Sequence, residues 1–164
     1  MLRRVKQAHA AELFGVAQST VSRWESGNLT PEPAERAAIE RLLTARLDSA
    51  ADHALARLVG ESPRAVHLIC DLTHRLMALS RARAAGLEGD WIGQSLWRFA
   101  TPAIAAHEMR LAERGWFDAP QAMPCEFDPG DNGAAAVPVR QGLCRWTRFT
   151  LSDGKAVRLV ETLQ

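Results

Sequence analysis

The sequence predicts a protein of the α + α/β class, with an all-α N-terminal domain, a long linker helix, and a C-terminal antiparallel sheet with flanking helices. Two breaks divide the chain, "GNLTPEP" and "GESP", because Gly, Asn and Pro interrupt helices. After the second break, helical spacing gives way to short apolar runs. We therefore expect domains at residues 1–47 and 62–164, joined by a linker helix at 48–61.

Composition places the chain among ordinary globular proteins. Of its 164 residues, 47% are hydrophobic, which is enough to build domain cores. The net charge of +1 does not by itself suggest a nucleic-acid partner. Three cysteines without a CxxC motif, and no secretory leader, indicate a reducing compartment. No apolar run approaches the ~18 residues of a membrane span, so we expect a soluble, cytoplasmic protein without disulfides and without membrane contact.

The N-terminal stretch "QAHAAELFGVAQSTVSRWES" has the pattern of two packed helices. Ala11 is small enough to let the helices approach closely, and Gly15 can adopt the left-handed turn between them. Phe14, Val21 and Trp24 then form the apolar seam. These positions meet the steric requirements of a helix-turn-helix.

The second of these helices leaves a polar face exposed. With Val21 and Trp24 turned inward, the outward residues include Gln18 and Arg23. Such a helix fits the major groove of DNA, where Gln pairs with adenine and Arg with guanine.

This segment resembles the Cro and phage-repressor (XRE) helix-turn-helix family over about residues 3–47. The matching positions are Gln7, Ala11, Glu12, Leu13, Gly15, Val16, Ser19 to Gly27 and Pro31. The resemblance implies double-stranded DNA as the partner. It implies that Gln7 and Thr20 contact phosphates, that Gln18, Ser19, Ser22 and Arg23 face bases, and that Glu25 is structural.

The chain departs from the family pattern at its start. Family members carry a full helix before the one that begins at Gln7, whereas only "MLRRVK" precedes it here. We therefore expect a truncated first helix. Either the true start lies upstream of Met1, or the module is shortened and recovers its packing from a partner.

Residues 34–59 lack Gly and Pro and carry one apolar stripe, which predicts a long amphipathic helix. The stripe consists of Ile39, Leu43, Leu47, Ala51, Leu55 and Leu58. It is longer than the N-terminal domain alone can cover. We expect Leu43 and Leu47 to serve that domain, and Leu55 and Leu58 to contact a partner chain or the second domain. A homodimer is therefore expected.

The C-terminal region resembles a PAS domain over about residues 62–163. The resemblance is carried by "LICDLTHRLMALSRARAAGL", "WIGQSLWRFATP" and the closing "RWTRFTLSDGKAVRLVETL". The last segment predicts a hairpin with a type I′ turn at Asp153-Gly154. An alternative keeps residues 63–85 as one helix, because Ser62-Pro63 is a good helix start.

Histidines and a cysteine in this region raise the question of a metal or haem site. On a helix, His67, Cys70 and His74 would share one face as candidate metal ligands. On a strand, His67 and Cys70 point to opposite faces; we favour the strand, and with it no metal site and Cys70 as a core residue. By resemblance to haem-binding PAS domains, His107 is a candidate axial ligand, the alternative being a surface or hydrogen-bonded histidine beside Glu108.

Aromatic residues of the C-terminal region admit two roles. Trp91, Trp97, Phe99 and Trp116 either pack a core or line a small-molecule pocket. The cofactor, if one is bound, is not identified by the sequence.

Together these features predict a DNA-binding transcriptional regulator whose PAS-like domain senses a small-molecule effector or mediates dimerisation. An alternative is a ligand-binding or protein-interaction module whose shortened head does not bind DNA. The sequence shows no arrangement of a nucleophile and a base that would predict an enzyme.

Overall fold

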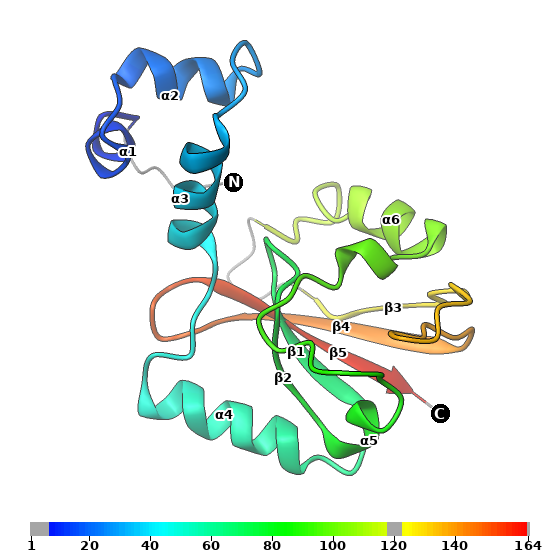
Figure 1. Cartoon of the computed structure of the whole chain (residues 1–164). Helices are drawn as coiled ribbons and strands as arrows, with labels where there is room; N and C mark the ends of the chain where they lie inside the picture. Colours follow the sequence, from blue (N-terminus) through cyan, green and yellow to red (C-terminus); the bar gives the residue numbers. More distant parts are fainter. Residues whose placement is uncertain (1–6, 118–122, 164) are drawn as a thin grey trace. The chain divides into compact units, whose positions relative to one another are not determined.

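The computed structural model describes residues 7–117 and 123–163, and the chain divides into two compact units, Met1–Leu43 and Thr44–Gln164. Figure 1 shows the helices of the first unit and the sheet and helices of the second. The expected truncation of a first helix concerns residues 1–6, which lie outside the described residues. No helix in the described part of the chain is long and apolar enough to span a membrane.

The N-terminal unit contains the helices α1 (Gln7–Phe14), α2 (Gln18–Glu25) and α3 (Pro33–Leu43). Gly15 ends α1 with a φ of 65°, the left-handed conformation that glycine adopts most easily. Ala11 and Val21 are buried, and the rings of Phe14 and Trp24 meet edge to face with centroids 6.1 Å apart. The predicted pair of helices with a turn at Gly15 is therefore confirmed.

The predicted single helix over residues 34–59 is wrong, whereas the helix expected at 48–61 has a counterpart in Ala50–Glu61. Helix α3 ends at Leu43, residues 44–49 form neither helix nor strand, and α4 (Ala50–Glu61) begins afresh. Ser49 starts α4 with a capping box: its Oγ accepts from the Asp52 N–H (3.1 Å), and its own N–H donates to Asp52 Oδ2 (3.0 Å). A capping box satisfies backbone groups at a helix start, so it favours a new helix here. The apolar spacing alone did not reveal this break.

The second unit is built on one five-stranded antiparallel sheet with strand order β2-β1-β5-β4-β3. The strands are β1 (Val66–Cys70), β2 (Leu76–Leu79), β3 (Cys125–Phe127), β4 (Leu143–Thr150) and β5 (Ala156–Leu163). The strand at 66–70 rules out the alternative of one helix over residues 63–85. Between β2 and β3 lie α5 (Arg81–Ala84), the 3-10 helix η1 (Trp97–Phe99) and α6 (Pro102–Met109).

The β4–β5 hairpin is confirmed, but its turn differs from the expected type I′. Gly154 has a φ of 78°, whereas Asp153 does not have the positive φ that type I′ requires. The Gly154 N–H donates to Leu151 O (3.0 Å), and the Leu151 N–H donates to Lys155 O (2.9 Å). Ser152, Asp153 and Gly154 thus form a three-residue loop with glycine at its left-handed position.

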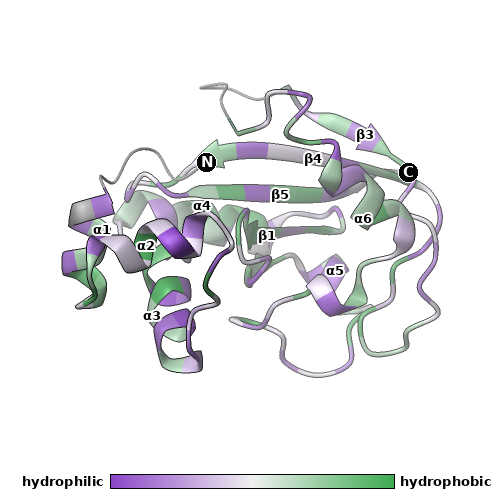
Figure 2. Ribbon diagram, turned by 90° about the horizontal axis from the view of Figure 1, so that it is seen from above, coloured by the Kyte–Doolittle hydropathy of each residue, from purple (hydrophilic) through white to green (hydrophobic). Residues whose placement is uncertain are grey.

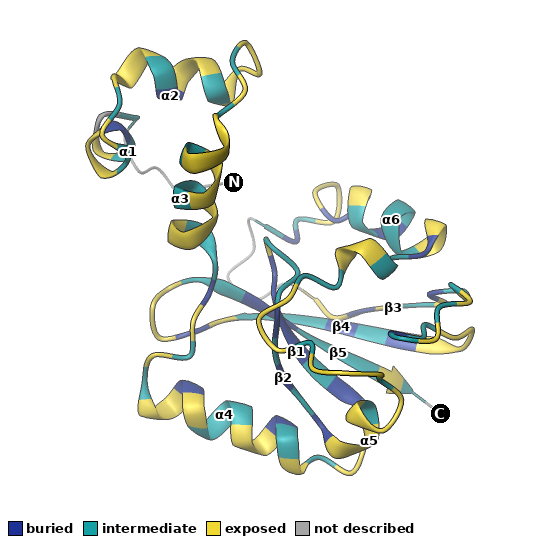
Figure 3. Ribbon diagram, viewed as in Figure 1, coloured by how far each residue is buried: buried dark blue, intermediate teal, exposed yellow. Residues whose placement is uncertain are grey.

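Alternate residues of the sheet supply two separate cores. One core lies under α4, which contacts β1 and β2, and its buried residues are Ala45, Val59, Val66, Leu68, Cys70, Ala78, Leu151 and Val157. The other core lies on the opposite face, and its buried residues are Leu111, Trp116, Cys125, Cys144 and Trp146. Figure 2 shows mostly hydrophobic residues along β1 and β5, and Figure 3 shows the burial of β1.

Candidate ligand cavity and candidate nucleic-acid interface

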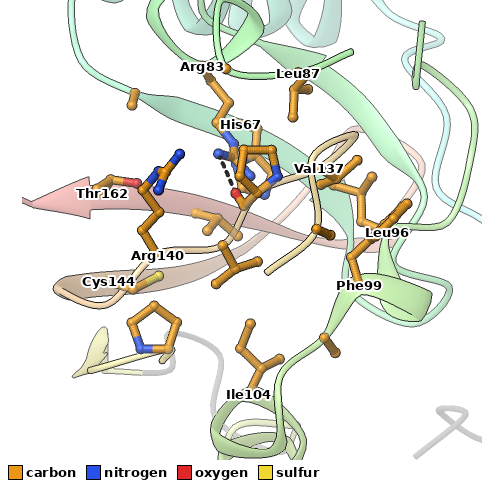
Figure 4. Close-up of a pocket in the computed structure, with 18 of the residues that line it drawn as sticks. His67, Arg83, Leu87, Leu96, Phe99, Ile104, Val137, Arg140, Cys144 and Thr162 are labelled. Atoms are coloured by element: carbon orange, nitrogen blue, oxygen red, sulfur yellow. Dashed lines mark hydrogen bonds between the residues drawn. The ribbon is translucent and has the colours of Figure 1, made fainter. Parts of the chain in front are cut away.

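A cavity of about 620 Å³ lies on the sheet face opposite α4. Strands β1, β4 and β5 form its floor, while α5, η1, α6 and the β3–β4 connection surround it. Its apolar lining includes Ile69. Figure 4 labels five further apolar residues of the lining: Leu87, Leu96, Phe99, Ile104 and Val137. A cavity of this size and lining is typical of small-molecule sites.

The loop "DPGDNGAAA" becomes a wall of this cavity. Asn132 fixes it: Nδ2 donates to Phe99 O (2.9 Å) and Val137 O (3.0 Å), and Oδ1 accepts from the Val139 N–H (3.0 Å). The backbone of Glu88 also donates to Ala136 O (2.9 Å). The described residues 128–134 form neither helix nor strand, and hydrogen bonds from Asn132 rather than regular structure hold the loop over the sheet.

A buried charged cluster closes one side of the cavity. Arg158, fully buried on β5, binds Asp71 through Nη2 (2.7 Å) and Glu108 through Nη1 (2.6 Å). Asp71 also accepts from Arg148 Nε (3.0 Å) and from the Trp116 indole N–H (3.2 Å). Two carboxylates thus face two guanidinium groups, so the cluster compensates its own fixed charges.

His74 extends this cluster into the cavity wall. Its Nε2 lies 3.5 Å from Glu108 Oε1, an ion pair when His74 is protonated, and its ring stacks on Trp97 at a centroid distance of 4.6 Å. Burial raises the pKa of Glu108, but hydrogen bonds and charge from His74 and Arg158 outweigh it and hold the pKa at about 2. Glu108 is therefore ionised at neutral pH.

Arg83 and His67 stand at another part of the lining, near one another (Figure 4). Ser80 positions Arg83, because its Oγ accepts from the Arg83 N–H (3.1 Å) at the start of α5. Arg83 Nη1 donates to Pro138 O (3.2 Å), and burial lowers the pKa of the guanidinium. Burial and the charge of Arg83 lower the pKa of His67 to about 3, so its imidazole is neutral at pH 7.

Two of the three candidate metal ligands separate as the strand prediction requires. His67 lines the cavity, whereas Cys70 is buried in the core under α4 and its Sγ accepts from the Ala45 N–H (3.3 Å). No group of three or more metal-binding side chains gathers within residues 7–117 and 123–163. Cys144 also lines the cavity; burial raises its pKa to about 12, so it contributes an apolar surface rather than a nucleophile.

His107 does not fit the role of a haem ligand. An axial histidine must direct a ring nitrogen into the haem cavity. His107 is not part of the cavity lining; its ring stacks on Phe127 at 3.9 Å and meets Trp146 edge-on at 5.2 Å. The residues around His107 form a closed aromatic cluster, so the expectation of haem ligation by His107 is not supported.

Of the aromatic residues expected either to pack a core or to line a small-molecule pocket, some do each. Trp97 and Phe99 line the cavity, whereas Trp116 is buried in the core. Trp91 meets Phe99 edge-on at 5.1 Å and carries the guanidinium of Arg98 over its ring. The sequence analysis missed Arg83 and Arg158 as cavity residues, and Asp71 as the buried partner of Arg158. A charged side chain within the apolar strand "AVRLVETL" was the signal for Arg158.

Helix α2 presents the polar surface expected of a nucleic-acid interface. Gln18, Ser19, Ser22 and Arg23 are exposed, and Thr20 is partly buried. Their placement on one exposed helix is the geometry that groove contact requires.

Gln7 has a partner within the unit. Its Nε2 donates to Glu25 Oε2 (2.7 Å), which joins the start of α1 to the end of α2. Glu25 therefore makes a contact between the two helices. A phosphate contact by Gln7 would have to form beside this bond or replace it.

No family model matches the chain, and no curated protein matches it. Among solved structures it is similar to the PAS domain of an HTR-like protein from Haloarcula marismortui, with a TM-score of 0.49 and 16% identity, over 69% of this chain and 90% of that one. It is also similar to the PAS domain of BvgS from Bordetella pertussis, with a TM-score of 0.46 and 14% identity, over 71% of this chain and 88% of that one. A periplasmic sensor domain of a chemotaxis protein matches with a TM-score of 0.28 and 15% identity, over 99% of this chain and 96% of that one.

Along the chain, the second unit has a strand that ends at Cys70, a second strand, short helices, a third strand and a closing hairpin, all in one antiparallel sheet. The second unit is accordingly described as a PAS-like antiparallel sheet with flanking helices.

Proposed function

We propose that this protein is a sequence-specific DNA-binding transcriptional regulator of the cytoplasm, and that it binds double-stranded DNA as a homodimer. The observation that carries this proposal is the exposed polar surface of α2, on which Gln18 and Arg23 are exposed while Val21 is buried. Bidentate contacts from such side chains distinguish bases in the major groove. A dimer would read two half-sites about one helical turn apart.

The second unit supplies the sensory part of this proposal. Its cavity of about 620 Å³ can hold a small effector. An effector regulates DNA binding only if it favours one arrangement of the protein over another.

A second candidate function is a ligand-binding or interaction module whose head does not bind DNA. The observation that favours it is the charge of the described head, in which residues 7–43 carry three Arg against five Glu. The basic residues Arg3, Arg4 and Lys6 lie outside the described part. DNA affinity depends strongly on neutralising phosphates.

DNA selection from a random oligonucleotide pool with the full chain separates these two candidates. The proposal expects an enriched site with two-fold symmetry. In gel-shift titrations on that site, Arg23→Ala should weaken binding by ~1–3 kcal/mol, because a base contact is lost. Arg36→Ala, an exposed position on α3, is the matched control and should change affinity much less.

Circular dichroism should show both variants folded. If no sequence is enriched, the interaction module becomes the better description. If Arg23→Ala and Arg36→Ala weaken binding equally, α2 is not the base-contacting helix.

A further inference from the structure

The charges that line the cavity do not balance once the internal pairs are set aside. Glu108 and Arg158 both contribute to the lining, but they are bonded to one another. The remaining charged residues of the lining besides the histidines are the half-buried Arg83 and the exposed Arg140 and Glu88. No ion pair links Arg83 to a carboxylate of the described residues.

Arg83 is the group that most needs a partner. Its guanidinium has five N–H donors, and its one described side-chain hydrogen bond uses Nη1. The side chain is half-buried, and a cation drawn away from water without a counter-charge lowers the stability of the fold. A carboxylate fits the planar fork of a guanidinium by two parallel hydrogen bonds.

His67 provides a second unsatisfied group beside Arg83. Its Nδ1 is buried and has no hydrogen-bond partner. The ring is neutral at pH 7, because burial and the neighbouring guanidinium charge both disfavour the imidazolium. A neutral imidazole with its proton on Nδ1 donates one hydrogen bond, for which a carboxylate oxygen is a suitable acceptor.

The rest of the lining favours a ligand whose uncharged part is apolar. Leu87, Leu96, Phe99, Ile104 and Val137 offer an apolar surface to it (Figure 4). Arg158 is paired with Glu108 and Arg140 is exposed, which leaves Arg83 as the half-buried guanidinium without an ionic partner. One such guanidinium and one neutral imidazole match a single negative charge, whereas a phosphate dianion calls for more donors.

We propose that the cavity binds a small monocarboxylate with an apolar body, held by Arg83 as its ionic partner and by His67 as a neutral hydrogen-bond donor. This inference rests on the sensory part of the proposed function and names its ligand class. It assigns a binding role to two residues that the sequence did not single out for an organic ligand.

Isothermal titration of the full-length protein with octanoate and with 4-phenylbutyrate tests the proposal. Each acid is paired with its primary amide, which has nearly the same shape and no charge. At least one acid should bind and raise the melting temperature, and its amide should bind at least about tenfold more weakly, because a charge-assisted pair is lost. This comparison needs no variant.

Two Arg→Met variants on the same helix locate the ionic partner. Arg83→Met should weaken acid binding about tenfold or more and leave amide binding nearly unchanged. Arg81→Met is the matched control, since Arg81 is exposed on α5 outside the lining, and it should bind the acid like the wild type. Circular dichroism checks that both variants are folded.

Three results would overturn the proposal: no binding of either acid, equal affinity for acid and amide, or equal acid affinity in Arg83→Met and the wild type. None of these measurements involves DNA, and the gel shift above involves no acid. A failed ligand class and a failed DNA-binding function are therefore distinguishable.

Discussion

At the scale of single residues, Arg158 and Glu108 show how a buried charge is retained in this fold. Arg158 Nη1 and Nη2 lie 2.6 and 3.1 Å from the two oxygens of Glu108, and Asp71 binds Arg158 Nε at 2.8 Å. The pair closes a wall of the cavity and joins α6 to β5. Removing one member leaves the other charge buried without a full partner, which costs more than the pair contributes.

Glu108→Gln should therefore lower the free energy of unfolding at pH 7 by about 1–2 kcal/mol, after allowance for solvent screening. The folded-state pKa of Glu108 is about 2, below its ordinary value of 4.5. Because the pKa of Glu108 is lower in the folded state, its ionised carboxylate stabilises the fold above pH 4.5. This stabilisation disappears as the pH falls from 4.5 toward 2. Urea unfolding at several pH values measures it.

The exposed Glu113 gives the matched control for this experiment. Glu113→Gln should leave the stability at pH 7 almost unchanged and should keep the wild-type loss between pH 4.5 and 2. Glu108→Gln should flatten that loss. A Glu108→Gln protein with the wild-type pH profile would show that another group is responsible.

Residue roles could be predicted only where neighbours in sequence determine them. Gly15 and Val21 belong to one local pattern, and their conformation and burial were predicted correctly. Asp71, Glu108 and Arg158 come from distant segments that only the folded sheet brings together. A single sequence carries no record of such long-range pairs, which is why this part of the candidate site was missed.

At the scale of elements, two leucines of α4 differ in burial, although the sequence analysis placed both on one apolar stripe. Leu55 packs against the core under the sheet, whereas Leu58 is 63% exposed. Asp52 fixes the helix to the β4–β5 hairpin, because Ser152 donates to it from both its N–H (3.2 Å) and its hydroxyl. These hydrogen bonds lower the pKa of Asp52.

Leu55→Glu should consequently destabilise the second unit by about 3 kcal/mol or more, because it places a charge in an apolar core. Leu58→Glu should change the stability of the folded unit by less than about 0.5 kcal/mol. Thermal unfolding of the two variants measures the difference. Equal effects would mean that α4 does not pack as described.

Leu58→Glu also tests the expected homodimer without disturbing the core. Light scattering should show a monomer if the partner chain covers Leu58. A Leu58→Glu protein that stays dimeric would place the dimer contact elsewhere.

Strands and helices were predicted correctly where turn residues stand at both ends of a short segment. "DGK" between apolar runs predicted the closing hairpin, and its loop type failed because Asp153 keeps a negative φ. The prediction of one helix over 34–59 was wrong because the apolar spacing continues from Leu43 to Leu47 across a break in the helix. The expectation that Leu47 serves the N-terminal domain was also wrong, because Leu47 packs against the core of the second unit. Lys155 Nζ donates to Thr44 O (3.1 Å), and Ala45 is 4% exposed.

At the scale of the whole molecule, the second unit begins at Thr44 rather than at residue 62. A fragment of residues 44–164 should unfold cooperatively in urea and give a mixed α/β circular dichroism spectrum. A fragment of residues 62–164 lacks α4 and exposes Val66 and Leu68 of β1, so it should be less stable or aggregate. Equal stability of the two fragments would contradict this boundary.

The strand order also has a kinetic consequence. The centre of the sheet pairs β1 with β5, so residues 66–70 meet residues 157–161 across most of the unit. Strands that are close in sequence, such as β4 and β5, can pair quickly. Pairing of β1 with β5 closes a long loop, which costs chain entropy and makes this step slower. At ~5–20 residues per second, a ribosome releases β1 several seconds before β5 exists. During that interval the apolar faces of β1 have only β2 and α4 to cover them, so the nascent chain is most exposed to misassociation just before its last strand emerges.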